Sequence, residues 1–345
     1  MFFTRNLITP LALGAEFLGS GGGGSSQYET LLLDSLLQEQ SVSVIPVEQI
    51  DKNALVLPVA YMGAPIVCLE QIPSPSNFLD LIAASKRIYG KQPDYLMPAE
   101  IGGANGLTAL VGSCITNIPV VDADLLGRAY PRLEMASTNL VQIPPSPAIL
   151  TDGMGKIVII EADSPEQIES IARNVSIAFG SSALVSLYPL QGKDLVRGTI
   201  AGSITQAINI GESIRQARQS TKPLDVLLTQ LPAVKLHGTG CITNSTTTLH
   251  EGFAKGTMYI KTEQQETFCI EYQNEYLFLT KNNLDIVSTP DIITILDAEN
   301  LHPILSDQIQ IGLRVTIISL PSPDCWYTKQ GLALVGPKAF TRSNV

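Results

Sequence analysis

"SNFLDLIAASKRIYGKQPDYLMPAEIGGANGLTALVGSCITNIPVVDAD" (residues 76–124) alternates segments typical of helices with segments typical of buried strands. Apolar side chains recur at helical spacing in 76–90 and 104–117, whereas 94–100 and 118–124 are short apolar runs. Strands that alternate with helices predict a mainly parallel sheet with helices on both of its faces. This stretch therefore places the N-terminal part of the chain in the α/β class.

The same alternation extends on both sides of this stretch. Further strands are predicted at 41–47, 54–63, 155–162 and 182–190, and further helices at 8–20, 164–180 and 202–220. Ser164 is placed to cap the helix that Pro165 begins, since serine caps helices well and proline suits the first helical position.

From about residue 231 the composition changes to runs rich in Thr, Ile, Tyr and Phe, punctuated by Gly, Asn and Asp. This pattern predicts a β-rich domain, either a small barrel or a sandwich. The predicted division is 1–165 for an α/β domain with a glycine-rich loop, 166–230 for an α/β extension with connecting helices, and 231–345 for the β-rich domain. Its last segment, "GLALVGPKAF" (331–340), is apolar enough that we expect it to pack back on the first domain.

The composition limits the classes of partner. The chain has 345 residues, of which 45% are hydrophobic and 16% charged, with a formal net charge of −10. Such a charge repels nucleic acid, and no apolar run is long enough to cross a bilayer. Five scattered cysteines without a CxxC pair suit reduced thiols, so we expect a cytoplasmic protein. We also expect it to be a homo-oligomer and to bind a small molecule.

A glycine loop, "GSGGGGSS" (19–26), includes Gly21, Gly22, Gly23 and Gly24. It follows a helical segment rather than a strand, and Ser25 stands where a Walker loop has lysine, so no nucleotide is expected. Either Ser25 or Ser26 can cap the next helix, and the free backbone N–H groups there suit a carboxylate or a ring carbonyl. The alternative is a tight connection where two helices approach each other closely.

Acidic residues follow two of the predicted strands. Glu100 is followed by Gly102 and Gly103, and the next strand ends in Asp122 and Asp124, followed by Arg128 and Glu134. Ligands of open α/β sheets bind beyond the carboxyl ends of the strands, so we expect the glycine loop, Glu100 and Asp124 to share one cleft. Glu100 is a candidate general base. Asp122 and Asp124 can grip a cation or hold Arg128, and the alternative is that these acids cap helices and form turns.

Other catalytic constellations are weak. His237 and Cys241 lie close in sequence, but their spacing matches no standard zinc pattern, and a structural role is favoured over metal binding. No G-x-S-x-G motif is present, which argues against a serine hydrolase. A divalent metal stays possible, and the residues do not decide whether one is used.

Seven collinear motifs carry a family resemblance: "ALGAEFLGSGGGG", "LPVAYMGAP", "PAEIGGANG", "PVVDADLLGRAYPRLEM", "GFAKGT", "TPDIITILDAEN" and "LALVGPKAF". Together they resemble the S-methyl-thiohydantoin desulfurase-like family over nearly the whole chain. The resemblance implies an α/β domain followed by a β-rich domain, and an activity in which water displaces methanethiol from a thiohydantoin ring to give a hydantoin.

Carried onto this sequence, the resemblance implies catalytic roles for Glu100, Asp122, Asp124 and Arg128. It implies substrate-binding roles for Gly21, Gly22, Gly23, Gly24, Gly102, Gly103, Asn105 and Glu134, and the pattern of the glycine loop adds Ser25. The expected function is that of a hydrolase acting on a small cyclic amide or thioamide. The alternative is a non-catalytic accessory or ligand-binding subunit of a hydantoinase- or oxoprolinase-like system.

Overall fold

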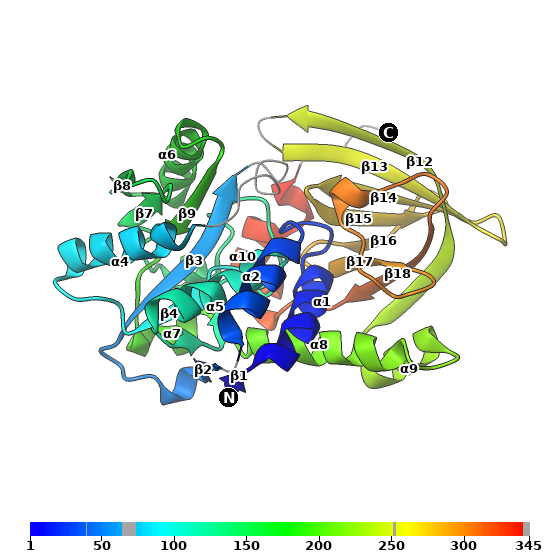
Figure 1. Cartoon of the computed structure of the whole chain (residues 1–345). Coiled ribbons are helices and arrows are strands. Elements are labelled where there is room, and N and C mark those ends of the chain that lie inside the picture. The colour runs from blue at the N-terminus through cyan, green and yellow to red at the C-terminus, as the bar shows by residue number, and fades with distance from the viewer. Residues whose placement is uncertain (39, 64–73, 251–252, 341–345) are drawn as a thin grey trace.

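The computed structural model describes residues 1–38, 40–63, 74–250 and 253–340, and for His250 only the backbone. It consists of an α/β layer and a curled antiparallel sheet, with helix α1 (Ile8–Leu18) between them (Figure 1). This confirms the predicted fold class, and it confirms the helix expected before the glycine loop.

The N-terminal sheet has the strand order β1-β2-β5-β4-β3-β9-β7-β8, with β10 paired to β3. Pairs β2–β5, β5–β4 and β4–β3 are parallel, while the strands that flank this centre are antiparallel. The sheet is therefore mixed, and the prediction of a mainly parallel sheet holds only for its centre. The strands are β1 (Phe2–Phe3), β2 (Val42–Ile45), β3 (Leu55–Gly63), β4 (Tyr95–Pro98), β5 (Val120–Val121), β7 (Ala148–Thr151), β8 (Ile157–Ile160), β9 (Ser182–Ser186) and β10 (Leu190–Gln191).

Both faces of this sheet are covered, as β3 shows. Leu55, Leu57 and Val59 join one hydrophobic cluster, whereas Val56 and Ala60 join another on the opposite face. Side chains alternate between the faces of a strand, so a strand buried on both faces is a near-continuous apolar run. The other helices are α2 (Gln27–Leu37), α4 (Pro75–Tyr89), α5 (Asn105–Thr116), α6 (Pro165–Ala178), α7 (Gly192–Gly198), α8 (Ser203–Ala217), α9 (Pro223–Gln230) and α10 (Lys329–Val335).

Helix α1 is apolar on nearly all sides and packs tightly against α8. A Cβ at Gly14 would lie 1.7 Å from the carbonyl oxygen of Ala207, and one at Gly211 would lie 1.7 Å from that of Pro10. No side chain fits in such gaps, so the two glycines let the two backbones touch. This contact fixes the direction in which α1 leads into the glycine loop.

The C-terminal sheet is antiparallel throughout and has the order β16-β15-β14-β13-β12-β18-β17. Long strands β12 and β13 curl over its other strands (Figure 1). Its strands are β12 (Lys235–His250), β13 (Phe253–Thr262), β14 (Thr267–Gln273), β15 (Glu275–Lys281), β16 (Leu284–Ser288), β17 (Ile292–Asp297) and β18 (Arg314–Leu320), and a separate two-stranded pair joins β6 (Ala123–Asp124) to β11 (Ile200–Ala201).

The segment after β18 returns to the first domain, as the sequence predicts. Trp326 is fully buried, and its indole N–H donates to the carbonyl of Leu126 at 2.8 Å. Its ring packs edge-on against Tyr130, and Val335 and Phe340 belong to the same cluster as β3 and β9. The C-terminal end therefore forms part of the core of the N-terminal domain.

Among the described residues, Cys114, Cys241, Cys269 and Cys325 are free thiols, and Cys68 lies outside them. None of the helices in the described ranges is both long and apolar enough to cross a membrane.

We predict that Trp326→Ala lowers the free energy of unfolding by about 3–5 kcal/mol, because it empties a filled core site and orphans the Leu126 carbonyl. Leu332→Ala, at a position 39% exposed in the same segment, is the matched control and is expected to change stability by less than about 1 kcal/mol. Urea unfolding followed by circular dichroism measures both, since Trp326 is the only tryptophan and fluorescence is lost with it. Equal stability of the two variants would contradict the packing described here.

Candidate functional site

A cavity of about 520 Å³ lies where the two domains meet. Its walls include the glycine loop, the ends of β3 and β4, the turn between β14 and β15, and residues near Tyr130. This volume is within the range of small-molecule sites, and the lining mixes apolar side chains with a few polar groups that converge. The cavity is therefore the candidate functional site.

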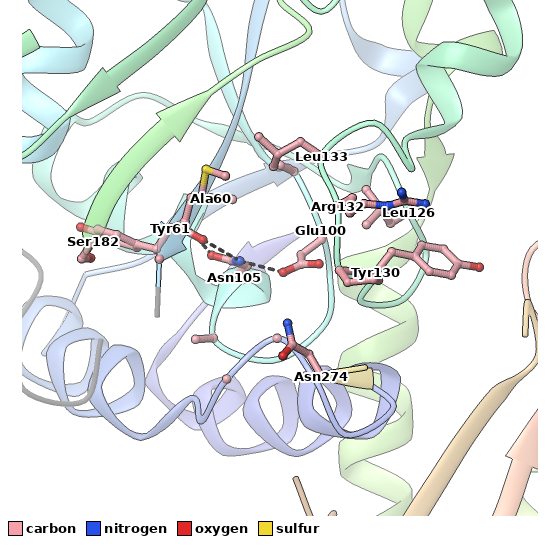
Figure 2. A pocket seen from close by; sticks show the side chains of 18 of the residues that line it. Ala60, Tyr61, Glu100, Asn105, Leu126, Tyr130, Arg132, Leu133, Ser182 and Asn274 are labelled. Atoms are coloured by element: carbon pink, nitrogen blue, oxygen red, sulfur yellow. Dashed lines mark hydrogen bonds between the residues drawn. The ribbon is translucent and has the colours of Figure 1, made fainter. Parts of the chain in front are cut away.

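Glu100 is the second residue after β4 and points its carboxyl group into this cavity (Figure 2). The side-chain amide of Asn105 donates to Glu100 Oε1 at 2.7 Å and to the carbonyl of Tyr61 at 3.2 Å. The backbone N–H of Tyr61 in turn donates to Asn105 Oδ1 at 2.7 Å. Because β3 holds Asn105 at both ends of its amide, Asn105 orients the carboxyl of Glu100.

The environment of Glu100 raises the pKa of its carboxyl group above the value in water. Burial raises the pKa of Glu100 to about 7, and the charge of Asp124 adds to the rise. The hydrogen bonds from Asn105 and from the backbone of Tyr130 oppose it, because they stabilise the anion. A carboxyl with a pKa near neutrality is suited to take a proton from water.

The glycine loop is attached to the C-terminal domain by Ser20. Its hydroxyl donates to the carbonyl of Ile293 at 2.7 Å, and its carbonyl accepts the N–H of Tyr276 at 2.6 Å. At the other end of the loop, Ser26 donates its N–H and its hydroxyl to the buried Glu16. Ser26 thus stands at the N-cap of α2, as one of the two predicted possibilities has it, but its side chain bonds Glu16 rather than the helix.

Of the four consecutive loop glycines, all but Gly24 leave no room for a side chain. A Cβ at Gly23 would lie 2.5 Å from the carbonyl oxygen of Gly102, and one at Gly103 would lie 2.4 Å from the carbonyl carbon of Gly23. None of the hydrogen bonds described for the chain uses the amide N–H of Gly23, Gly24 or Ser25. The loop therefore has free amide N–H groups, as the first prediction expects. It also makes a close approach, but to the turn after β4 and not between two helices, as the alternative expected.

Asp122 and Asp124 lie beneath the cavity rather than in its lining. Asp124 Oδ2 accepts the backbone N–H groups of Ile101 at 2.9 Å and Gly127 at 2.8 Å, and that of Leu126 at 3.1 Å. Asp122 Oδ1 accepts the N–H groups of Ile204 at 3.0 Å and Thr205 at 3.1 Å, at the start of α8. The geometry therefore fits the alternative that these two acids cap a helix and form turns. It gives no support to their predicted catalytic roles.

Arg128 is fully buried and also lies outside the cavity lining. Its guanidinium donates to backbone carbonyls of both domains instead of pairing with Asp122 as predicted. The acceptors are the carbonyls of Ala129 at 3.1 Å, Pro290 at 3.0 Å, Asp291 at 2.7 Å and Tyr276 at 3.3 Å. The guanidinium also stacks on the ring of Tyr130, with 4.8 Å to the ring centre. Arg128 joins the domains, and its predicted contact with substrate has no geometric support.

Some of the remaining predicted site residues line the cavity and others do not. Gly21, Gly22, Gly24 and Ser25 line the cavity with Gly23, Glu100 and Asn105, whereas Gly102, Gly103 and Glu134 do not. Glu134 pairs with Arg132, which does line the cavity, at 3.1 Å. His237 bonds the hydroxyl of Ser319 at 2.8 Å, and across the described parts of the chain no three His, Cys, Asp or Glu side chains are placed to hold one metal ion.

Sequence reasoning missed two buried acids of the cavity, Glu29 in α2 and Glu275 at the start of β15. Burial raises the pKa of Glu29 to about 7 and that of Glu275 to about 8. The sequence signal for Glu275 was the stretch "YQNEYLF" (272–278), in which one acid stands among aromatic residues of a buried strand.

Two family models together match almost the whole chain. The model described as the S-Me-THD-like N-terminal domain matches residues 6–162, and the one described as the S-Me-THD-like C-terminal domain matches residues 163–344. A search of curated protein sequences gives no match. Among solved structures, a crystal structure of a protein from Chromobacterium violaceum, a structural genomics target, is similar with a TM-score of 0.80, 22% identity, and coverage of 96% of this chain and 95% of that one. That likeness concerns the fold, and the division at residues 165 and 230 stays a prediction.

We predict that Gly23→Ala lowers the free energy of unfolding by about 3 kcal/mol or more, since it combines a positive φ of 77° with a backbone clash. Gly24→Ala is the matched control: its φ is 75°, but a Cβ there has no atom within 4 Å. We expect this control to lose only about 1–2 kcal/mol, the cost of the left-handed conformation. Urea unfolding measures both, and equal losses would contradict the close approach of Gly23 to Gly102.

We also predict that Arg128→Met lowers the free energy of unfolding by at least about 3 kcal/mol, because several buried carbonyls lose their donor. Arg314→Met removes an exposed arginine paired with Glu263 at 3.2 Å, and we expect it to cost less than about 1 kcal/mol. Thermal melts and urea unfolding compare the two. A stable Arg128→Met protein would contradict the joining role assigned to this residue.

Proposed function

The chain belongs to the S-methyl-thiohydantoin desulfurase-like family, and from this membership and the geometry of Glu100 we propose that it is a hydrolase. The proposed substrate is a small cyclic thioamide derivative, an S-methylated thiohydantoin, held in the cavity between the domains. Water replaces methanethiol at the ring carbon that carries sulfur. The observation that carries the proposal is an oriented carboxyl of raised pKa at the wall of a cavity of suitable size.

The chemistry requires a base, because water is a poor nucleophile toward an amidine-like carbon. In its ionised form Glu100 accepts one proton from the attacking water, and the new carbon–oxygen bond forms as the ring carbon becomes tetrahedral. Collapse of this intermediate breaks the carbon–sulfur bond and regenerates the ring amide with a carbonyl at that carbon. Asn105 keeps the carboxyl of Glu100 in place throughout, since β3 fixes its amide.

The ring needs hydrogen-bond donors and a shape-matched wall. The free amides of Gly23, Gly24 and Ser25 lie at the cavity and suit a ring carbonyl or a ring nitrogen that gains charge. Tyr61 and Leu133 contribute aromatic and apolar lining on the other side (Figure 2). A flat, neutral five-membered ring that carries a few polar atoms fits such a lining better than an extended charged molecule.

The direct test is to incubate the protein with S-methyl-thiohydantoins and follow thiol release with a chromogenic thiol reagent. Reaction in ¹⁸O-labelled water is expected to place one labelled oxygen on the hydantoin product. Binding of the ring without any thiol release would instead favour the accessory or ligand-binding alternative.

We predict that Glu100→Gln lowers the turnover number about 10²–10⁴-fold with little change in stability, because the amide keeps the size of the side chain but cannot accept the proton. In the unaltered protein, turnover should fall as the pH drops through about 7, where Glu100 becomes protonated. Asp124→Asn removes a like charge that raises the pKa of Glu100, so this acid limb should move to lower pH. The measurements are pH–rate profiles of all three proteins. Near-normal turnover by Glu100→Gln would exclude Glu100 as the base.

A further inference from the structure

Glu275 brings a second carboxyl group into the cavity from the C-terminal domain. It is the first residue of β15, only 3% of its surface is exposed, and it lines the cavity together with Glu100. Its Oε2 atom has no hydrogen-bonding partner within the described ranges. A buried, unpartnered carboxyl oxygen is costly, so its retention at the edge of a ligand cavity points to a ligand.

The neighbours of Glu275 fix it in place. Asn274 bonds Ala254 with both its backbone N–H at 2.8 Å and its side-chain oxygen at 2.9 Å. On the other side, the backbone of Tyr276 bonds Ser20 and the guanidinium of Arg128. Glu275 Oε1 lies 2.1 Å from the point that a Cβ of Gly22 would occupy, so the bare loop makes room for this carboxyl.

We propose that Glu275 is a second catalytic carboxyl group, which donates a proton to the leaving group while Glu100 takes one from water. This inference rests on the proposed function. It also extends the range of substrates to ring compounds whose leaving group is an amine, namely cyclic guanidines such as 2-iminohydantoins. An amine leaves only after it is protonated, whereas a thiolate needs less help, so a built-in acid widens the range toward poor leaving groups.

The step balances in both cases. The carbon–oxygen bond to water forms, and one water proton goes to Glu100. The carbon–sulfur or carbon–nitrogen bond breaks, and the proton of Glu275 goes to the departing sulfur or nitrogen. As the carbonyl forms, the second proton of the former water goes to the ring nitrogen of the S-methyl compound. In the imino compound it goes to the exocyclic nitrogen, which needs two protons to leave as ammonia. Proton exchange then resets both carboxyls. The products are a hydantoin and either a thiol or ammonia, with no oxidant or reductant involved.

The donors around the two acids decide their roles. Glu100 accepts from Asn105 and is near the N–H of Tyr130, which favours its anionic form, whereas Glu275 Oε2 has no donor and is better placed as the protonated partner. The charged groups that face Glu275 are Glu100, which disfavours its ionisation, and Arg128, which favours it. Burial and the charge of Glu100 both raise the pKa of Glu275. Because Glu275 Oε2 has no donor that would stabilise its anion, whereas Glu100 has Asn105, we assign the proton to Glu275.

The test varies the leaving group. Substrates are an S-(4-nitrophenyl) thiohydantoin, whose thiolate leaves without a proton, the S-methyl compound, and the 2-iminohydantoin. The unaltered protein is expected to cleave all three, with rates that depend only weakly on leaving-group pKa. Glu275→Gln should lose about 10²–10³-fold in kcat/KM on the S-methyl and imino substrates, but less than about threefold on the nitrophenyl one. The alkaline limb of its pH profile, near pH 8, should also disappear.

Glu263→Gln is the matched control, the same substitution at an exposed position of the same domain. Equal losses by Glu275→Gln on all three substrates, with the alkaline limb retained, would overturn the proton-donor role while leaving the proposed hydrolase intact. If Glu275→Gln does not fold, the unaltered protein still decides: a steep dependence of its rate on leaving-group pKa overturns the proposal. Failure of the unaltered protein on every substrate, including the nitrophenyl compound, instead rejects the proposed function itself.

Discussion

The buried guanidinium of Arg128 is the interaction on which the site depends, because it holds the two domains in register. Removing a guanidinium from water is costly, and here the cost is offset by four backbone carbonyls rather than by one carboxylate. One acceptor belongs to the N-terminal domain and three to the C-terminal domain. Carbonyls cannot move without moving the chain, so this contact fixes backbone to backbone. The carbonyl of Tyr276 is among them, and the next residue toward the N-terminus is Glu275.

The glycine loop also lies at the contact between the two domains, and its shape depends on how they dock. It runs between the turn after β4 and the start of β15, and it touches Gly102 in one domain and Glu275 in the other. A side chain at Gly22 would collide with Glu275, and one at Gly23 would collide with the turn after β4. Its glycines thus serve two purposes at once: they allow the close approach, and they leave amide N–H groups free at the cavity. The sequence predicted either free amides or a tight connection between two helices, whereas the close contact is with the turn after β4.

Much of the fold could be predicted because its signals are local. The run of 76–124, the cap at Ser164 and the change of composition near residue 231 each reflect contacts within a few turns or one strand. Glu100 and Asn105 could be placed because strand ends in α/β sheets converge at one edge. The same rule pointed to Asp122, whose carboxylate is used by α8, more than 80 residues later. Glu275 could not be placed, because only the docking of the second domain brings it to Glu100.

Two carboxyls drawn from different domains give the cavity a property that neither domain has alone. Within one domain, an isolated buried glutamic acid would simply take up a proton, since desolvation disfavours its charge. Across the junction, the ionised form of one acid helps to keep the other protonated, so one cavity carries both a base and an acid. Hydrogen-bond donors decide which acid acts as the base. Asn105, held by β3, stabilises the anion of Glu100, whereas no donor among the described residues reaches Glu275 Oε2. The complete site therefore forms only when the domains are docked, and the fully buried guanidinium of Arg128 holds that contact.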